Sequence, residues 1–513
     1  MKNRIMPSIF LLALLFLFAC SSYSYSKKYD EEKEEEISRP QSQPIEIEEI
    51  KTQAITHIPS YVIDLNINPE EMRVSGVLSV DFVNTSTYAL HNIYFNIPLN
   101  SFSPNATISP FLPNLKEAVF PHGHFYGYIG ITAAIGNLRA LDFTLYENLL
   151  RVYLQSPLYQ GEAIEIGLSF EAQIPKIAHR TGGNDNAIWL GSFLPRLSVL
   201  GEGGWHNYSF LPVGNPFKTQ TSNFLVNITT PPNYIVASAG SSFSIQREFS
   251  ETTTIESHFS RDLAFAILGD AYIAASTTSP RGANITLFHT TGDADDFEEI
   301  LNLSKEAFDH FSERIGANPQ SIFKIIQVDL FAPISIKYPG LTFVDERLLF
   351  SNAFPIVLVQ DIGHQWFYNV VGNNPVAEPW LAYGLVNYLA LGFLFDGNQE
   401  QISKHARQVY ENLQNSLDYM EHSRLGMGLS DYQSWQHFQN IQINRGMLLF
   451  YSLEQKMGSE SFTAFLKKYY QTFAFEIATV EVMRAVAEEV FSYCLKDFFE
   501  EWINSKGLPE IFF

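Results

Sequence analysis

The amino-acid sequence predicts an α+β protein of several domains, because its hydrophobic periodicity changes along the chain. The 513 residues, 46% of them hydrophobic, are enough to form several cores. Between residues 56 and 275 apolar side chains alternate with polar ones, as in half-buried strands. From about Asp296 the spacing becomes helical, with one β-rich run at residues 323–331. We therefore expect a β-sandwich-like domain over 56–275, an α/β domain over 276–395 and a helical bundle over 396–513.

The N-terminus has the layout of an export signal. Lys2 and Arg4 precede an apolar run, Ile9 to Ala19, that is too short to span a bilayer comfortably. The run ends in Leu17-Phe18-Ala19-Cys20, which resembles the bacterial lipobox. We therefore expect residues 1–19 to be a lipoprotein signal peptide and a lipid on Cys20 to anchor the exported protein to a cell-envelope membrane. The alternative is an ordinary secreted protein with a cysteine near its cleavage site.

Charge and cysteine content narrow the classes of function. Residues 20–55 are acidic and interrupted by proline, so we expect a flexible tether after the lipidated cysteine. The formal net charge of −22 and the lack of a basic patch argue against a nucleic-acid partner. Only Cys494 remains beyond Cys20, which excludes an intrachain disulfide and a thiolate zinc cluster in the exported domains. Cys494 lies in an apolar helical pattern and is expected to be a buried thiol.

Residues 355–388 are the most informative stretch of the chain. Their first half is apolar almost all round, which is typical of a buried helix. One stripe of that helix is polar and is formed by Gln360, Asp361, His364 and Tyr368. Buried polar side chains need partners, so the stripe should face a cleft or a hydrogen-bonded network. A second helix is predicted from Trp380 to Leu394.

Short motifs in a fixed order point to a known family. They are Gly204-Trp205-His206, Tyr338-Pro339-Gly340-Leu341, Gly363-His364-Gln365-Trp366-Phe367, Trp380-Leu381 followed by Gly384, and the run from Gly446 to Gly458. From about residue 56 to the end, the chain resembles the zinc aminopeptidases of the membrane alanyl aminopeptidase and leukotriene hydrolase type, which are gluzincin metallopeptidases. The resemblance implies that residues 276–395 are thermolysin-like and that residues 396–513 complete the peptidase-like domain. We expect no terminal domain of helical repeats.

The resemblance also implies a zinc site, and three positions of this chain correspond to its ligands. In that family zinc is held by two histidines of H-E-x-x-H and by a glutamate that follows after eighteen intervening residues. The spacing is kept here, but Gln360 and His364 stand at the histidine positions and Tyr383 at the glutamate position. An amide oxygen is a weak neutral donor, and a phenol with a pKa of about 10 must lose its proton to ligate well. We therefore expect no metal and no other cofactor at these positions.

Three further family positions have changed as well. Asp361 replaces the glutamate that activates zinc-bound water, and its side chain is one methylene shorter. Ile443 replaces the transition-state tyrosine and cannot donate a hydrogen bond. In the segment that holds the amino terminus of a substrate, Lys337 replaces the glutamate and is followed by Tyr338, Pro339 and Gly340. A lysine repels an α-ammonium group.

These residues support one interpretation and leave two alternatives open. The first is a lipid-anchored, catalytically inactive aminopeptidase homologue that binds or scaffolds a peptide or protein, with Lys337 favouring an acidic group. Its former metal cavity would hold a polar network of Gln360, Asp361, His364 and Tyr383. The second is an active metallopeptidase with an atypical metal site, for which His364 and Asp361 are two mixed ligands. The third is hydrolysis without a metal, for which no Ser-His-Asp or Cys-His constellation stands out.

Overall fold

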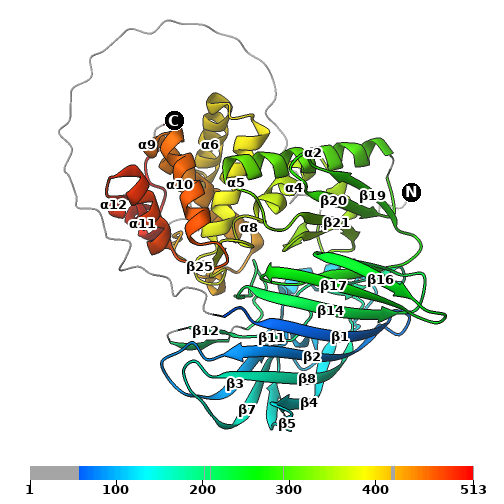
Figure 1. The fold of residues 1–513 in the computed structure, drawn as a ribbon. Helices are drawn as coiled ribbons and strands as arrows, with labels where there is room; N and C mark the ends of the chain where they lie inside the picture. The colour runs from blue at the N-terminus through cyan, green and yellow to red at the C-terminus, as the bar shows by residue number, and fades with distance from the viewer. Residues whose placement is uncertain (1–56, 202, 208, 293, 417–421, 512) are drawn as a thin grey trace, which may run out of the picture.

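A β-rich N-terminal part and a helical C-terminal part make up the molecule (Figure 1), as the periodicity predicts. The structure is a computed structural model that describes residues 57–513 apart from 202, 208, 293, 417–421 and 512. The predicted signal peptide, Cys20 and the acidic tether lie outside the described residues. Within the described part, no helix is both long enough and apolar enough to cross a membrane.

The largest sheet of the N-terminal part has eight strands. Side chains alternate along it, so that Ile63 and Leu65 are buried while Asp64 and Asn66 are exposed. This is the alternation that the sequence predicts. In spatial order the strands are β16 (Ser241–Gln246), β17 (Glu251–Ser260), β14 (Ser222–Thr230), β1 (Ser60–Asn68), β2 (Arg73–Val83), β8 (Ala163–Gln173), β4 (Tyr128–Gly136) and β5 (Arg139–Ala140).

Smaller sheets complete this part of the fold. One four-stranded sheet has the order β15 (Ile235–Ser238), β18 (Phe265–Leu268), β10 (Ala187–Leu190) and β9 (Thr181–Gly183). A second has the order β11 (Arg196–Leu197), β3 (Leu90–Asn96), β7 (Leu149–Leu158) and β6 (Phe143–Tyr146), and a two-stranded sheet pairs β12 (Val199–Gly201) with β13 (Gly204–His206). Apolar side chains of the eight-stranded and both four-stranded sheets share one core.

A five-stranded mixed sheet follows the N-terminal part. Its order is β19 (Ile273–Thr278), β20 (Asn284–His289), β21 (Ile322–Val328), β23 (Leu341–Asp345) and β22 (Ser335–Tyr338). The three central strands are parallel and the two edge strands are antiparallel to their neighbours. Because β19 pairs with β20, the sheet begins at Ile273, and the predicted domain boundary between residues 275 and 276 falls inside a strand.

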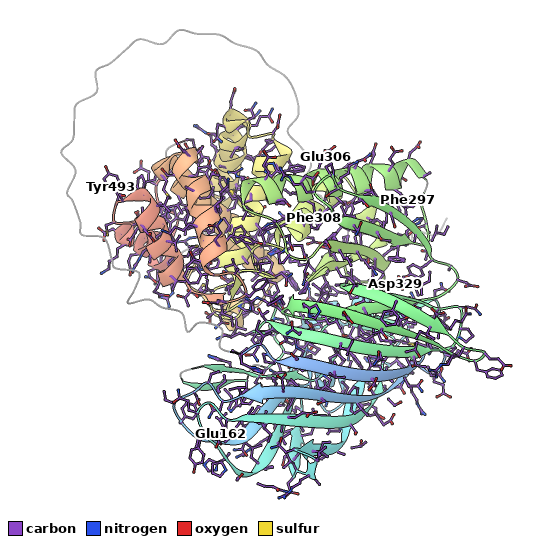
Figure 2. All side chains as sticks on the ribbon, in the orientation of Figure 1. Glu162, Phe297, Glu306, Phe308, Asp329 and Tyr493 are labelled. Carbon is purple, nitrogen blue, oxygen red and sulfur yellow. The ribbon has the colours of Figure 1, made fainter. Side chains whose placement is uncertain are left out.

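Helices cover this sheet and fill the C-terminal part. Phe297 and Phe308 of α2 (Ala294–Arg314) are buried, whereas Glu306 faces solvent (Figure 2). Further α-helices in the described residues are α1 (Lys116–Val119), α3 (Glu346–Leu349), α4 (Phe354–Gly363), α5 (Trp380–Leu394), α6 (Gln399–Gln414), α8 (Trp435–Phe438), α9 (Gly446–Met457), α10 (Ser459–Thr472), α11 (Val480–Phe491) and α12 (Lys496–Asn504). The 3-10 helices η3 (Pro98–Phe102), η4 (Pro113–Leu115) and η5 (Leu429–Asp431) and the π-helix η6 (Gln439–Arg445) are also present. The short strands β24 (Gly372–Asn373) and β25 (Ile477–Ala478) pair with each other. The predicted helix from Trp380 to Leu394 is confirmed.

Helices α5 and α9 approach closely at two glycines. A Cβ atom on Gly384 would lie 2.6 Å from the carbonyl carbon of Gly446, and a Cβ on Gly446 would lie 3.0 Å from the Cα of Gly384. Backbones that meet at this distance leave no room for a side chain at either position. The glycines therefore set the spacing of the helix that presents Tyr383.

The β-rich part and the five-stranded sheet are joined by a shared core and a buried arginine. Trp189 and Ala266 pack with Phe288, Ile326 and Tyr338 across the junction, among other side chains. Arg261, which is 1% exposed, donates hydrogen bonds to the carbonyl oxygens of Thr219, Asn369, Val370 and Glu476. The arginine therefore ties the end of β17 to the loops that follow α4 and α10.

The expectation for Cys494 is wrong. Its side chain is exposed in the turn between α11 and α12. Helix α11 ends at Phe491, and Ser492 adopts a left-handed conformation with a φ of 60°. The helical periodicity therefore does not continue through Cys494, although apolar residues lie on both sides of it.

Candidate functional site

The predicted polar stripe is shorter in the structure than in the sequence. Helix α4 ends at Gly363, His364 caps it, and Tyr368 lies in the following turn with a φ of 118°. The helix therefore aligns Gln360, Asp361 and His364 but not Tyr368. Asp361 and His364 are buried, whereas Gln360 is partly exposed. Tyr368 nevertheless stays near the site, because its phenol is close enough to Tyr383 for the two groups to interact electrostatically.

Asp361 is a buried carboxylate that a threonine holds. Its Oδ2 accepts a hydrogen bond of 2.7 Å from Oγ1 of Thr342 on β23, and only 1% of the side chain is exposed. Burial raises the pKa of Asp361, while the nearby Lys337 charge lowers it, and burial is the larger effect. The carboxylate is thus engaged within the protein rather than presented to solvent.

His364 is buried as a neutral imidazole. Its Nδ1 lies 3.2 Å from the carbonyl oxygen of Phe367, an arrangement in which Nδ1–H is the donor. Burial places the pKa of His364 well below its ordinary value, and the charge of Lys337 lowers the pKa further. The ring also packs edge-on against Tyr383, with 5.2 Å between ring centroids.

Gln360 is oriented by the neighbouring helix. Its Nε2 donates a hydrogen bond of 2.7 Å to Oδ1 of Asn387. Asn387 stands one helical turn after Tyr383 on α5, so these two residues face α4 together. The sequence analysis did not predict Asn387 as a site residue. Its position four residues after Tyr383 on the same predicted helix could have indicated it. The amide of Gln360 therefore serves as a link between α4 and α5.

Tyr383 stands at the centre of the group as a neutral phenol. Burial raises the pKa of Tyr383 to about 12, so the hydroxyl keeps its proton near neutral pH. Nζ of Lys337 lies 4.6 Å from the centroid of the Tyr383 ring, which is a cation–π distance. The ring also meets Phe438 edge-on at 5.5 Å. Tyr383 is only partly exposed, as is Lys337.

The three family ligand positions do not fit a zinc site. Gln360 supplies a neutral amide engaged with Asn387, Tyr383 supplies a protonated phenol, and His364 is the one strong donor. Structural and catalytic zinc sites use at least three strong protein ligands. Across residues 57–513, outside the few undescribed positions, no group of three or more His, Cys, Asp or Glu side chains is placed to hold a metal ion.

The segment that corresponds to the amine-anchoring position is fixed by the end of α4. Gln365 accepts a hydrogen bond of 2.8 Å from the backbone N–H of Gly340. Its Nε2 also donates to the carbonyl oxygens of Tyr338 and Asp361, both at 3.1 Å. The turn Tyr338-Pro339-Gly340 is therefore locked to α4, with Gly340 at a φ of 65°. Lys337 precedes this turn on the edge strand β22.

Lys337 itself is a desolvated cation beside a carboxylate. Burial lowers the pKa of Lys337, and the negative charge of Asp361 partly offsets the effect. The structure thus brings together five of the predicted site residues: Gln360, Asp361, His364, Tyr383 and Lys337. Ile443 lies on η6, where it is partly buried against the hydrophobic core of the helical part.

Sequence reasoning missed a basic residue that comes from the N-terminal part. Arg180, immediately before β9, is close enough to Tyr383 and Tyr338 for its charge to lower the pKa of both. Only folding brings this loop to α5, since 203 positions separate residues 180 and 383 in the chain. No local pattern around Arg180 marks it as a site residue.

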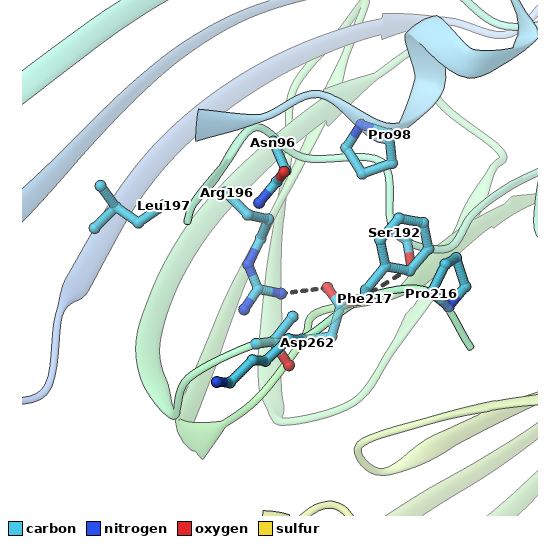
Figure 3. A pocket seen from close by; sticks show the side chains of 10 residues that line it. Asn96, Pro98, Ser192, Arg196, Leu197, Pro216, Phe217 and Asp262 are labelled. Carbon is cyan, nitrogen blue, oxygen red and sulfur yellow. Dashed lines mark hydrogen bonds and ion pairs between the residues drawn. The ribbon is translucent and has the colours of Figure 1, made fainter. Parts of the chain in front are cut away.

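A small pocket lies within the N-terminal part, near Arg180. It is lined by Ser192, Arg196, Phe217, Lys218 and Asp262, among others (Figure 3). Arg196 and Asp262 form an ion pair of 2.5 Å, and Ser192 donates to the same carboxyl group at 3.2 Å. The cavity has a volume of about 20 Å³. That space suits one water molecule rather than an organic ligand.

Comparison with known proteins identifies a family domain that part of the chain matches. Residues 301–502 match the peptidase family M1 domain. The chain contains an M1 peptidase domain. That domain runs from α2 to α12 and includes Gln360, His364 and Tyr383, so the predicted family resemblance is confirmed.

Individual relatives agree with the M1 assignment. Leukotriene A-4 hydrolase of Xenopus laevis is 28% identical over 200 residues, which cover 36% of this chain and 32% of that protein. Aminopeptidase M1-B of Oryza sativa subsp. japonica is 23% identical over 272 residues, which cover 47% of this chain and 29% of that protein. The chain thus matches about a third of the length of these curated relatives.

A solved structure shows that the likeness of fold extends beyond the M1 domain. An M1 zinc metallopeptidase from Deinococcus radiodurans superposes with a TM-score of 0.64 at 16% identity, covering 88% of this chain and 95% of that one. At this identity the likeness concerns the fold. The β-rich N-terminal part and the helical C-terminal part of this chain are therefore arranged as in M1 peptidases.

Proposed function

We propose that this chain is a member of the M1 family that binds a peptide or protein without hydrolysing it through zinc. The supporting observation is the state of the three family ligand positions. Gln360 bonds to Asn387, Tyr383 keeps its proton, and only His364 offers a strong donor. Zinc catalysis needs the metal to acidify a water molecule, and one histidine does not hold the metal.

The changes at the other family positions support the same proposal. Asp361 is buried and bonded to Thr342, so it is not poised to take a proton from water at an open position. Ile443 offers no donor to a developing oxyanion. Metal, base and oxyanion donor are separate requirements of one mechanism, and all three have changed.

The partly exposed polar side chains of the site are consistent with binding without catalysis. Gln360, Lys337, Tyr368 and Tyr383 are each partly exposed, so part of each polar side chain is accessible from outside the protein. Lys337 favours an acidic group on that ligand over an α-ammonium group. We further propose that a lipid on Cys20 holds the exported chain at a membrane of the cell envelope, where the partner is met.

The test is zinc content measured together with peptidase turnover. We expect elemental analysis of the purified chain to find far less than one zinc ion per molecule, and aminoacyl-amide substrates to remain uncleaved in added zinc. Near-stoichiometric zinc with turnover would instead establish an active metallopeptidase with an atypical metal site.

A matched variant shows whether the assay can detect a restored zinc site. Combining Gln360→His, Asp361→Glu and Tyr383→Glu rebuilds the family ligands and base, so this variant should bind zinc. Turnover should still be low, because Ile443 and the residues around the ligands have also changed. Full turnover in the triple variant would show that activity was lost only at those three positions.

A further inference from the structure

Two neighbouring buried polar atoms, Nε of Arg180 and Oη of Tyr338, have no hydrogen-bond partner of normal geometry among the described residues. Arg180 is 8% exposed, and its guanidinium stacks over the rings of Phe210 and Phe217, with 5.3 and 5.2 Å from Cζ to the two centroids. Its Nη2 donates a long bond of 3.4 Å to the carbonyl oxygen of Gly214. Among the described residues, Nε of Arg180 has no hydrogen-bond partner. A buried unsatisfied guanidinium donor is costly unless something outside the chain accepts from it.

The second such donor is the hydroxyl of Tyr338. Only 5% of Tyr338 is exposed, and its Oη lies beside Arg180 and Ser192. No hydrogen bond of normal geometry reaches this Oη from the part of the chain that the structure describes. The hydroxyl packs so closely on Gly191 that a Cβ there would lie 2.2 Å from Oη. Tyr338 is thus held in place with its hydroxyl close to Arg180 and Ser192.

Lys337 supplies a second cation close to Tyr383. Its ammonium group lies over the Tyr383 ring at 4.6 Å from Nζ to the centroid. The charge of Arg180 also acts on the Tyr383 phenol. Lys337 on β22 and Arg180 in the N-terminal part therefore both act on Tyr383, which is partly exposed.

The local charge balance favours an anion. The charge of Lys337 acts on Asp361, whose carboxylate also accepts a hydrogen bond from Thr342. The other nearby carboxylate, Asp262, is paired with Arg196 and accepts from Ser192. Asp361 thus balances Lys337, whereas Nε of Arg180 has no acceptor among the described residues. A carboxylate matches a guanidinium by two parallel hydrogen bonds and can accept from further donors.

We propose that Arg180, Lys337, Tyr338 and Tyr383 form a recognition site for a carboxylate group of a bound peptide. The guanidinium and the ammonium group supply the charge, and the two phenols donate hydrogen bonds. This inference rests on the proposed function, since it names the chemistry that the binding surface recognises. The α-carboxylate of a peptide and the side chain of Asp or Glu present the same group, and the experiment separates them.

The experiment is isothermal titration of the purified chain with four short peptides. They are trialanine with a free carboxylate, its C-terminal amide, its N-acetylated acid, and Ala-Asp-Ala amide. We expect both free acids to bind and the trialanine amide to bind at least about tenfold more weakly, which is the usual size of a lost charged hydrogen bond. Tight binding of Ala-Asp-Ala amide would assign the site to acidic side chains, and weak binding would assign it to the α-carboxylate.

Substitutions of Lys337 and Arg180 test whether these residues are responsible for the binding of the acidic peptides. Lys337→Met keeps the length of the side chain and should weaken acid binding about tenfold without changing the amide. Lys324→Met is the matched control: Lys324 is a partly buried lysine of the same sheet, 5.9 Å from the Phe288 ring centroid, and its loss should change neither. Arg180→Lys retains the charge and should weaken binding less than Arg180→Met.

Two results would overturn this inference in different ways. Equal affinity for acid and amide, unchanged in Lys337→Met, would mean that peptides bind without carboxylate recognition, so that only the further inference fails. No binding of any of the four peptides, with the chain shown folded by circular dichroism, would count against the proposed peptide-binding function as well.

Discussion

Glu378 offers a direct test of the electrostatics of this fold. It stands just before α5 and is mostly buried, and its Oε1 accepts a hydrogen bond of 3.3 Å from the N–H of Val480, the first residue of α11. Burial raises the pKa of Glu378 to about 7, and the charge of Glu481 adds to the rise, while the Val480 bond and Lys218 oppose it. The carboxyl group is therefore most stable in the folded chain when it is protonated.

The sign and size of the effect follow from linkage. A folded-state pKa above the unfolded value of 4.5 means that the folded chain binds the proton more tightly. This stabilisation is fully present below pH 4.5 and is lost as the pH rises through about 7. Between pH 5 and pH 8 the loss is about 2–3 kcal/mol, since each pKa unit corresponds to about 1.4 kcal/mol.

Glu378→Gln removes the titration but keeps an oxygen that can accept from Val480. Urea unfolding of both proteins at pH 5, 6, 7 and 8 measures the difference in unfolding free energy. We expect this difference to move by about 2–3 kcal/mol in favour of the Gln variant between pH 5 and pH 8. Glu299→Gln, at an exposed position on α2, should show no such change. Parallel pH profiles for the wild type and Glu378→Gln would refute the reasoning.

Two further predictions concern stability near the site. Thr342→Val removes the hydrogen bond to the buried Asp361 carboxylate and should cost about 1–3 kcal/mol, seen as a lower thermal midpoint that Thr342→Ser largely restores. An unchanged midpoint in Thr342→Val would mean that Asp361 does not depend on this bond. Gly384→Ala places a Cβ against the backbone of Gly446 and should cost about 1–3 kcal/mol, whereas Gly392→Ala on the same helix meets only the tip of a flexible arginine and should cost less. Equal midpoints for the two alanine variants would contradict the close helix contact.

Much of the fold follows from periodicity that can be read locally. The alternation in β1 gives the buried and exposed faces that the structure has, and the apolar run from Trp380 to Leu394 is a single helix with the predicted ends. The failures occur where a helix stops. Left-handed Ser492 ends α11 before Cys494, and α4 ends before Tyr368, because capping and turn geometry override the apolar spacing on either side.

In the candidate site, too, some features follow from local sequence and others depend on the tertiary structure. The sequence by itself determined which residues occupy the family ligand positions, because the eighteen-residue spacing and the motifs around His364 and Tyr383 are local features of one stretch of chain. Only the tertiary structure decided what those residues contact. Thr342 bonds to Asp361 and Arg180 approaches Tyr383 because the five-stranded sheet and the N-terminal part pack against α4 and α5. Burial also sets the charge state of Tyr383 and Glu378, since the cost of desolvating a charge depends on every element packed around it.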